Sequence, residues 1–139
     1  MGKGSVDTDD LIAAFTLPFT RGLLFVDDTA TTARHAGWNP VTDWVHADND
    51  SLWICVRGAA DGPATVELYR APPSASTLKG LAHLHSGALD TPTRELRVTD
   101  SDGAIVVTHP VYADRVHVDV HTDPDTGGER VVIGIRPVG

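Results

Sequence analysis

The feature that most constrains this chain is a strict alternation of apolar and polar residues within short segments. Residues 116–121 alternate valine with histidine or aspartate, and segments 65–69 and 95–99 follow the same period of two. In 52–57 aliphatic residues alternate with Trp53, Cys55 and Arg57. Successive side chains of a β-strand point to opposite faces, so each segment has one apolar face that must be buried. The pattern therefore predicts amphipathic strands that pair into sheets.

Turn-forming residues separate these segments and limit the room for helices. The chain has thirteen glycines, nine prolines and sixteen aspartates, but only three glutamates and two lysines. Aspartate favours turns and caps, whereas glutamate and lysine favour helix interiors. We expect an all-β fold, a two-sheet antiparallel β-sandwich or small barrel of about eight strands with one or two short helices. The best helix candidate is 30–36, which Asp28 or Thr29 could cap and Gly37 could end. Segments 52–56 and 66–68 are expected to form a hairpin or adjacent strands.

The length of 139 residues fits a single β-sandwich domain spanning 1–139. Residues 1–8 are expected to be disordered, because they carry no apolar pattern. The N-terminus lacks the apolar stretch of a signal peptide, and no apolar run approaches the roughly 18 residues of a membrane helix. We therefore expect a cytoplasmic protein. The single cysteine, Cys55, excludes an internal disulfide framework.

The net charge of −8 restricts the class of partner. Nucleic acids and anionic membranes attract basic surfaces, so neither is an expected partner. An acidic surface can instead steer association with a basic protein. The sequence also lacks a Gly-x-Ser-x-Gly element, a phosphate-binding loop and a Cys-x-x-Cys pair. A binding protein without catalysis or cofactor is therefore the first hypothesis, although an enzyme is not excluded.

Aromatic and acidic residues gather in one segment that could contact such a partner. Three tryptophans lie within residues 38–53, and tryptophan is enriched at interface hot spots. The alternative is that these tryptophans cover an open end of the sandwich. The residues expected to bind are Trp38, Asp43, Trp44, Asp48 and Asp50.

A second hypothesis is a small metal-binding enzyme. Histidines two residues apart on a strand share a face, and imidazole together with carboxylate suits Zn or Fe. The candidate ligands are His83, His85, His117, Asp119 and His121. All could converge only if the two strands were neighbours, and positions i and i+4 are about 13 Å apart along a strand. The alternative is that these side chains form the solvated face of amphipathic strands. A third hypothesis is a structural or assembly subunit that pairs through an exposed strand.

The order of elements from residue 94 onward resembles a known family. Residues 94–98 are followed by the turn Ser101-Asp102-Gly103, the segment 104–107, the alternating segment 116–120 and a last apolar strand after a glycine. Segment 33–38, a helix end with glycine and then an aromatic residue, fits more loosely. This order is similar to that of competence protein J, a small β-sandwich protein that inhibits a nuclease. Related β-sandwich proteins act as immunity proteins beside bacterial toxins. The resemblance implies an inhibitor or immunity protein and carries over no site residues.

Overall fold

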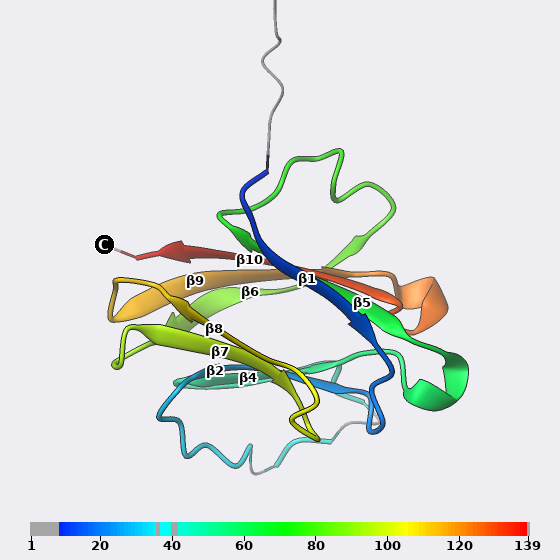
Figure 1. Cartoon of the computed structure of the whole chain (residues 1–139), viewed down its shortest axis with the longest axis horizontal. Helices are drawn as coiled ribbons and strands as arrows, with labels where there is room; N and C mark the ends of the chain where they lie inside the picture. Colours follow the sequence, from blue (N-terminus) through cyan, green and yellow to red (C-terminus); the bar gives the residue numbers. More distant parts are fainter. Residues whose placement is uncertain (1–8, 36, 40–41, 139) are drawn as a thin grey trace, which may run out of the picture.

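The computed structural model describes residues 9–35, 37–39 and 42–138. Within these residues, ten strands form two five-stranded sheets that pack face to face (Figure 1). The first sheet has the order β1 (Leu11–Leu17), β5 (Ala64–Arg70), β10 (Arg130–Pro137), β9 (Arg115–Thr122) and β6 (Ala82–Asp90). The second has the order β3 (Val45–Asp48), β4 (Ser51–Cys55), β2 (Leu23–Asp28), β7 (Glu95–Asp100) and β8 (Val106–Pro110).

The pairing within each sheet is antiparallel with one exception, the parallel pair of β5 and β10. Each sheet is open, with β1 and β6 as the edges of the first and β3 and β8 as the edges of the second. The expected β-sandwich is therefore confirmed, and the sheets do not close into the barrel that was the other expected form. Residues 1–8, which were expected to be disordered, lie outside the described residues.

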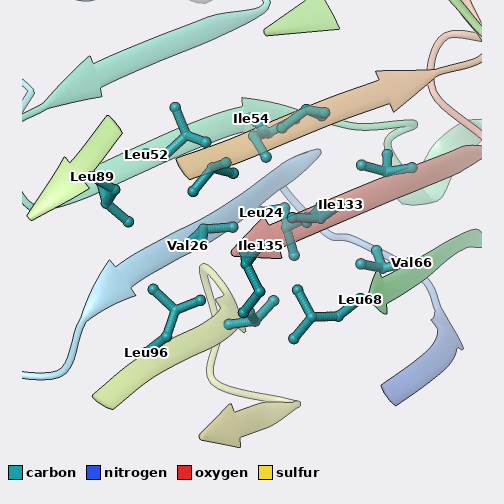
Figure 2. Packing of buried hydrophobic residues seen from close by; sticks show 14 of the residues in the cluster. Leu24, Val26, Leu52, Ile54, Val66, Leu68, Leu89, Leu96, Ile133 and Ile135 are labelled. Carbon is teal, nitrogen blue, oxygen red and sulfur yellow. The ribbon is translucent and has the colours of Figure 1, made fainter. Parts of the chain in front are cut away.

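The core lies between the two sheets and is made by the inward faces of the strands (Figure 2). Val116, Val118 and Val120 of β9 are at most 1% exposed, while the residues between them are half-buried. Ile133 of β10 and Leu24 of β2 are fully buried, one from each sheet. The period-two alternation thus decides which face of each strand enters the core, as the sequence predicted.

The helix expected over 30–36 does not form in its described part, residues 30–35. Side chains take up the backbone donors there: Ala30 N donates to the Asp28 carboxylate and Ala33 N donates to the Thr31 hydroxyl. The Thr31 hydroxyl in turn donates to Asp50 Oδ1, 2.6 Å away. Such local bonds compete with helical ones, which explains the correction.

The helices among the described residues are two short 3₁₀ turns, η1 (Ala59–Asp61) and η2 (Pro124–Thr126). Neither of these described helices has the length and apolar character needed to cross a membrane.

The expected pairing of segments 52–56 and 66–68 is wrong, because β4 and β5 belong to different sheets. The chain passes from one sheet to the other through η1, and the apolar faces of β4 and β5 both line the core.

Candidate functional site

The candidate site lies on the outer face of the second sheet, next to the edge strand β3. Leu24, Val26, Leu52 and Ile54 of β2 and β4 point into the core, so the residues between them point outward. The described residues between β2 and β3 (29–35, 37–39 and 42–44), here called the covering segment, pass over this outer face, on the side of the sheet away from the core (Figure 1). Polar residues that would otherwise meet water are therefore covered.

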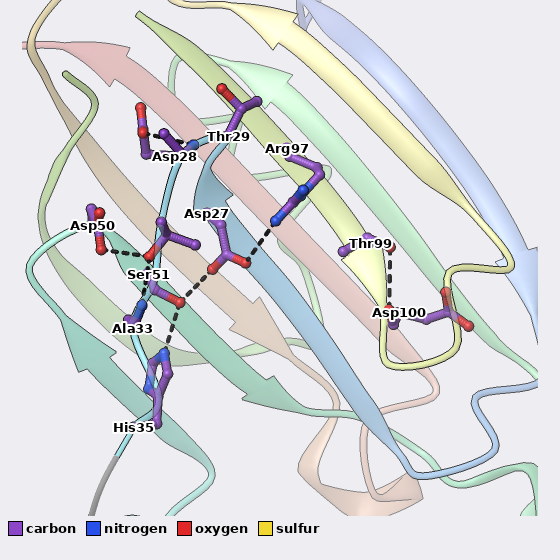
Figure 3. A network of polar contacts seen from close by, with 12 residues as sticks. Asp27, Asp28, Thr29, Ala33, His35, Asp50, Ser51, Arg97, Thr99 and Asp100 are labelled. Carbon is purple, nitrogen blue, oxygen red and sulfur yellow. Dashed lines mark hydrogen bonds and ion pairs between the residues drawn. The ribbon is translucent and has the colours of Figure 1, made fainter. Parts of the chain in front are cut away.

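Cross-strand pairs bring Asp27 of β2 opposite Ser51 of β4 on one side and opposite Arg97 of β7 on the other. Asp27 is 4% exposed and Ser51 is fully buried. Figure 3 shows Asp27 between Ser51 and Arg97. The Ser51 hydroxyl donates a short hydrogen bond to Asp27 Oδ1, and Arg97 Nη2 lies 3.9 Å from Asp27 Oδ2. Burial outweighs these stabilising contacts and raises the pKa of Asp27 to about 6.

His35 extends this polar chain toward the surface. Its Nε2 lies 2.7 Å from Ser51 Oγ, and its Nδ1 lies 2.8 Å from Nδ1 of His46 on β3. When Asp27 is ionised it accepts a hydrogen bond from the Ser51 hydroxyl. Ser51 Oγ then accepts from His35 Nε2–H, and His35 Nδ1 accepts from His46 Nδ1–H. Burial lowers the pKa of His35, which favours the neutral ring.

Aromatic rings hold His35 in place. Its ring stacks on Trp53 with centroids 4.1 Å apart and an interplanar angle of 21°, and Trp53 stacks in turn on Phe25 at 4.7 Å. Trp38 meets Trp53 edge-on at 5.4 Å and donates its indole N–H to the Asp43 carbonyl, 3.0 Å away. The covering segment is therefore attached to the sheet by both stacking and hydrogen bonds.

The residues predicted to bind a partner lie around this same edge of the sheet. Trp38 and Asp43 are half-buried in the covering segment, and Trp44, the residue before β3, is 38% exposed. Asp48 is exposed at the end of β3, and Asp50 is half-buried where it accepts from Thr31. The tryptophans thus divide between the two alternatives, because Trp38 covers the sheet whereas Trp44 reaches the surface.

The residues of the metal hypothesis lie on the neighbouring strands β6 and β9 of the other sheet. His83 and His121 are opposite each other, with ring centroids 5.1 Å apart. His117 Nε2 lies 3.2 Å from Asp119 Oδ1, separately from that pair.

Ser86 joins the second of these groups, and His85 interacts electrostatically with both: burial, His83 and His117 lower its pKa, while Asp119 opposes them. The Ser86 hydroxyl donates to Asp119 Oδ1 at 2.6 Å and lies 2.8 Å from His117 Nε2. His85 follows the irregularity in the pairing of β6 with β9, and its Nε2 lies beside Gly87. The strands are therefore neighbours, as the hypothesis required, but among the described residues no three of these five side chains bring their ligand atoms within 4.8 Å of one another.

The sequence pattern did not identify four residues of this site as candidates: Asp27, His35, His46 and Ser51. No two of these residues fall within a recognisable motif, and they are brought together by strand pairing and by the covering segment. One signal was present: Asp27 and Asp28 end an otherwise apolar buried strand. A carboxylate in such a position needs hydrogen-bond partners, so it marks a polar network.

The buried part of this site is unsuited to nucleophilic catalysis. Ser51 is inaccessible to a substrate, and its proton is donated to Asp27 rather than to His35. The arrangement instead attaches the covering segment to the sheet through His35.

Replacing Ser51 with alanine should reduce the free energy of unfolding by about 2–3 kcal/mol, since Asp27 and His35 both lose a buried hydrogen-bond partner. Urea denaturation of both proteins measures this difference. Ser86→Ala is the matched control, because Ser86 bridges His117 and Asp119 on an exposed surface. Its expected cost is below about 1 kcal/mol. Equal costs for the two variants would contradict the importance of the buried network.

Comparisons with known proteins extend the description of the fold. No protein-family model matches the sequence, and no curated protein matches it significantly. Two solved structures are similar over nearly the whole chain. One is ComJ from Bacillus subtilis, described as an inhibitor of the DNA-degrading activity of NucA, with a TM-score of 0.70 and 10% identity. The similarity spans 94% of this chain and 99% of the ComJ chain. The other is the product of crocagin biosynthetic gene J, with a TM-score of 0.56, 14% identity and coverage of 95% and 99%. The expected resemblance to competence protein J is thus confirmed at the level of the fold.

Proposed function

We propose that this chain is an inhibitor that binds a basic protein, such as a nuclease or toxin, and carries out no chemistry of its own. The observation that carries the proposal is that the predicted binding residues all lie around one edge strand, β3. We call the surface formed by Trp38, Asp43, Trp44, Asp48 and Asp50 the acidic-aromatic rim.

The charge of this region supports a basic partner. Residues 27–50 contain five aspartates and one arginine, which account for half of the net charge of −8. Asp48 is exposed and the carboxylate of Asp43 is half-exposed, so part of this charge faces a partner directly. Acidic side chains at the rim of an interface accelerate association with a basic protein and disfavour acidic competitors.

The aromatic part of the rim supports a specific contact. Trp44 is a large hydrophobic side chain that remains 38% exposed. Trp38 beside it is held by its hydrogen bond to Asp43 and by its contact with Trp53. An aromatic side chain on a rigid support loses little conformational entropy on binding, as is typical of hot-spot residues.

The similarity to ComJ suggests the class of partner. ComJ inhibits a DNA-degrading protein, and the two chains share a fold over 94% of this one. A nuclease is therefore the first partner to test, and a basic nuclease would match the charge of the rim. We propose that this chain meets its partner in the bacterial cytoplasm.

The test is to capture the partner from the source organism with the wild-type chain and to measure the Kd of the purified pair with EDTA present. Trp44→Ala should weaken binding about 30-fold, corresponding to a hot spot of about 2 kcal/mol. Asp48→Lys should slow association, and this effect should shrink at high salt. The captured protein should also lose its activity on plasmid DNA in the presence of the wild-type chain and the metal ion that it needs.

Tyr112→Ala is the control for these variants. Tyr112 is 82% exposed but follows β8, the edge of the second sheet opposite to β3. Its substitution should leave the Kd unchanged. An acidic partner, or a partner whose binding depends on Tyr112 and not on Trp44 or Asp48, would overturn the proposal.

A further inference from the structure

Three side chains at the edge of the second sheet form a cluster with a chemistry of its own. His35, His46 and Asp48, here called the His-His-Asp cluster, each offer one ligand atom, and these atoms all lie within 4.8 Å of one another. Among the residues that the structure describes, this is the one set of three His, Cys, Asp or Glu side chains that meets that distance. The two imidazoles face each other through their Nδ1 atoms, 2.8 Å apart.

Strand geometry explains why the cluster forms. His46 and Asp48 are two residues apart on β3, so both side chains lie on the same face of the sheet. Their partners on β4 are Trp53 and Ser51, which belong to the outer face. His35 reaches the same place from the covering segment, because it stacks on Trp53 and is hydrogen-bonded to Ser51.

The hydrogen bonds behind His35 prepare it to act as a ligand. With Asp27 ionised, the chain of bonds through Ser51 holds the proton of His35 on Nε2. The lone pair of Nδ1 is then directed at the cluster, where it now accepts a bond from His46. A metal-binding histidine characteristically donates its other ring N–H to an outer oxygen, which fixes the tautomer and the ring orientation.

The His35 ring is also rigid. It is 4% exposed, and its plane lies against Trp53. The residue has a φ of 51°, in the left-handed region that non-glycine residues rarely adopt. The contacts with Trp53 and Ser51 offset the cost of this conformation, so the ring is held in place before any ligand arrives.

We propose that the His-His-Asp cluster binds one divalent transition-metal ion, with zinc as the best match. Two imidazoles and one carboxylate form a ligand set that zinc uses where a fourth position stays open. Zinc–nitrogen distances of about 2.0 Å place two tetrahedral ligands about 3.3 Å apart. The imidazoles therefore need to separate by about half an ångström, and the exposed Asp48 to move inward. His46 can bind the ion through Nδ1 in the tautomer that carries its ring proton on Nε2.

This site differs from the one that the sequence suggested on β6 and β9. His83 and His121 approach each other there, but among the residues that the structure describes no third ligand atom joins them within the same distance. The proposal for the His-His-Asp cluster does not rest on the proposed inhibitor function, although Asp48 belongs to both the cluster and the acidic-aromatic rim.

The experiment is a calorimetric titration of Zn²⁺ into the untagged full chain after treatment with EDTA and desalting. We expect one ion per chain. His46→Ala should weaken the affinity by more than about 100-fold, since losing a ligand costs more than losing an outer partner. Asp48→Asn, which keeps the shape of an exposed side chain, should weaken it at least about tenfold. The visible spectrum of the Co²⁺ form should show a four-coordinate ion, and both variants should change that spectrum.

The double variant His83→Ala/His121→Ala is the matched control, because it removes two imidazoles that also face each other across a strand pair. It should bind zinc as the wild-type chain does. Thermal unfolding in EDTA shows that each variant is folded. The absence of a stoichiometric ion, wild-type affinity in both His46→Ala and Asp48→Asn, or loss of binding in the control alone would each overturn the proposal.

Discussion

Replacing Asp27 with asparagine should remove a pH-dependent contribution to stability of about 3 kcal/mol. The pKa of Asp27 is raised from 3.8 to about 6 by burial, and each unit corresponds to about 1.4 kcal/mol. In the wild-type protein the folded state therefore holds a proton on Asp27 at pH values where the unfolded chain has already lost it. This contribution is fully present below pH 3.8 and is lost as the pH rises through 6.

The measurement is the free energy of unfolding of both proteins by urea between pH 3.5 and pH 8, with EDTA present. The difference, wild type minus Asp27→Asn, should fall by about 3 kcal/mol between about pH 4 and pH 7. The lowered pKa values of Asp9, Glu67 and Asp119 make the free energy of unfolding rise with pH. Both proteins contain these three groups, so this rise cancels in the difference. Asp102→Asn, an exposed carboxylate in the turn after β7, is the matched control. A difference that stays constant with pH for Asp27→Asn would contradict this account of the site.

Ile133→Ala should reduce the free energy of unfolding by about 3–4 kcal/mol. Ile133 is fully buried in β10, which lies between β5 and β9 in the first sheet. Its cross-strand neighbours Leu68 and Val120 are also buried, and strand pairing prevents them from collapsing into the space left behind. The cost is therefore the lost transfer free energy together with that of a cavity.

Urea denaturation should show this loss as a lower midpoint with little change in the slope m. Val106→Ala is the control, because Val106 is 55% exposed on the edge strand β8. Its expected cost is within about 0.5 kcal/mol. A loss below about 1.5 kcal/mol for Ile133→Ala would show that the core between the sheets can relax around the missing atoms.

Much of the fold could be predicted because its cause is local. The alternation over 116–121 assigns three valines to one face, and these valines are buried in the structure. The wrong predictions concern segments that make contacts with residues distant in the sequence. Segment 30–35 has a plausible helix cap in Asp28, but the Asp28 carboxylate also accepts from the backbone and side chain of Thr93, and Thr31 donates to Asp50. These contacts hold the segment over the sheet in a non-helical path.

The candidate site could be predicted only in part, and for a similar reason. The acidic-aromatic rim lies in one stretch of sequence, so its composition was visible before its geometry. The buried chain under it joins Asp27 to Ser51, 24 residues apart, and Ser51 to His35, 16 residues apart. No spacing rule links these positions, because they meet through the pairing of β2 with β4.

By itself, the sequence determined that the chain forms amphipathic strands, which faces of them are apolar, and that the net charge is negative. A period of two leaves one apolar face that must be buried, so the pattern predicts a two-sheet sandwich or a small barrel. The tertiary structure alone decided which strands are neighbours and which outward-facing side chains share a site. Pairing depends on how whole faces fit across the core, and His35, His46 and Asp48 come together only after that choice is made.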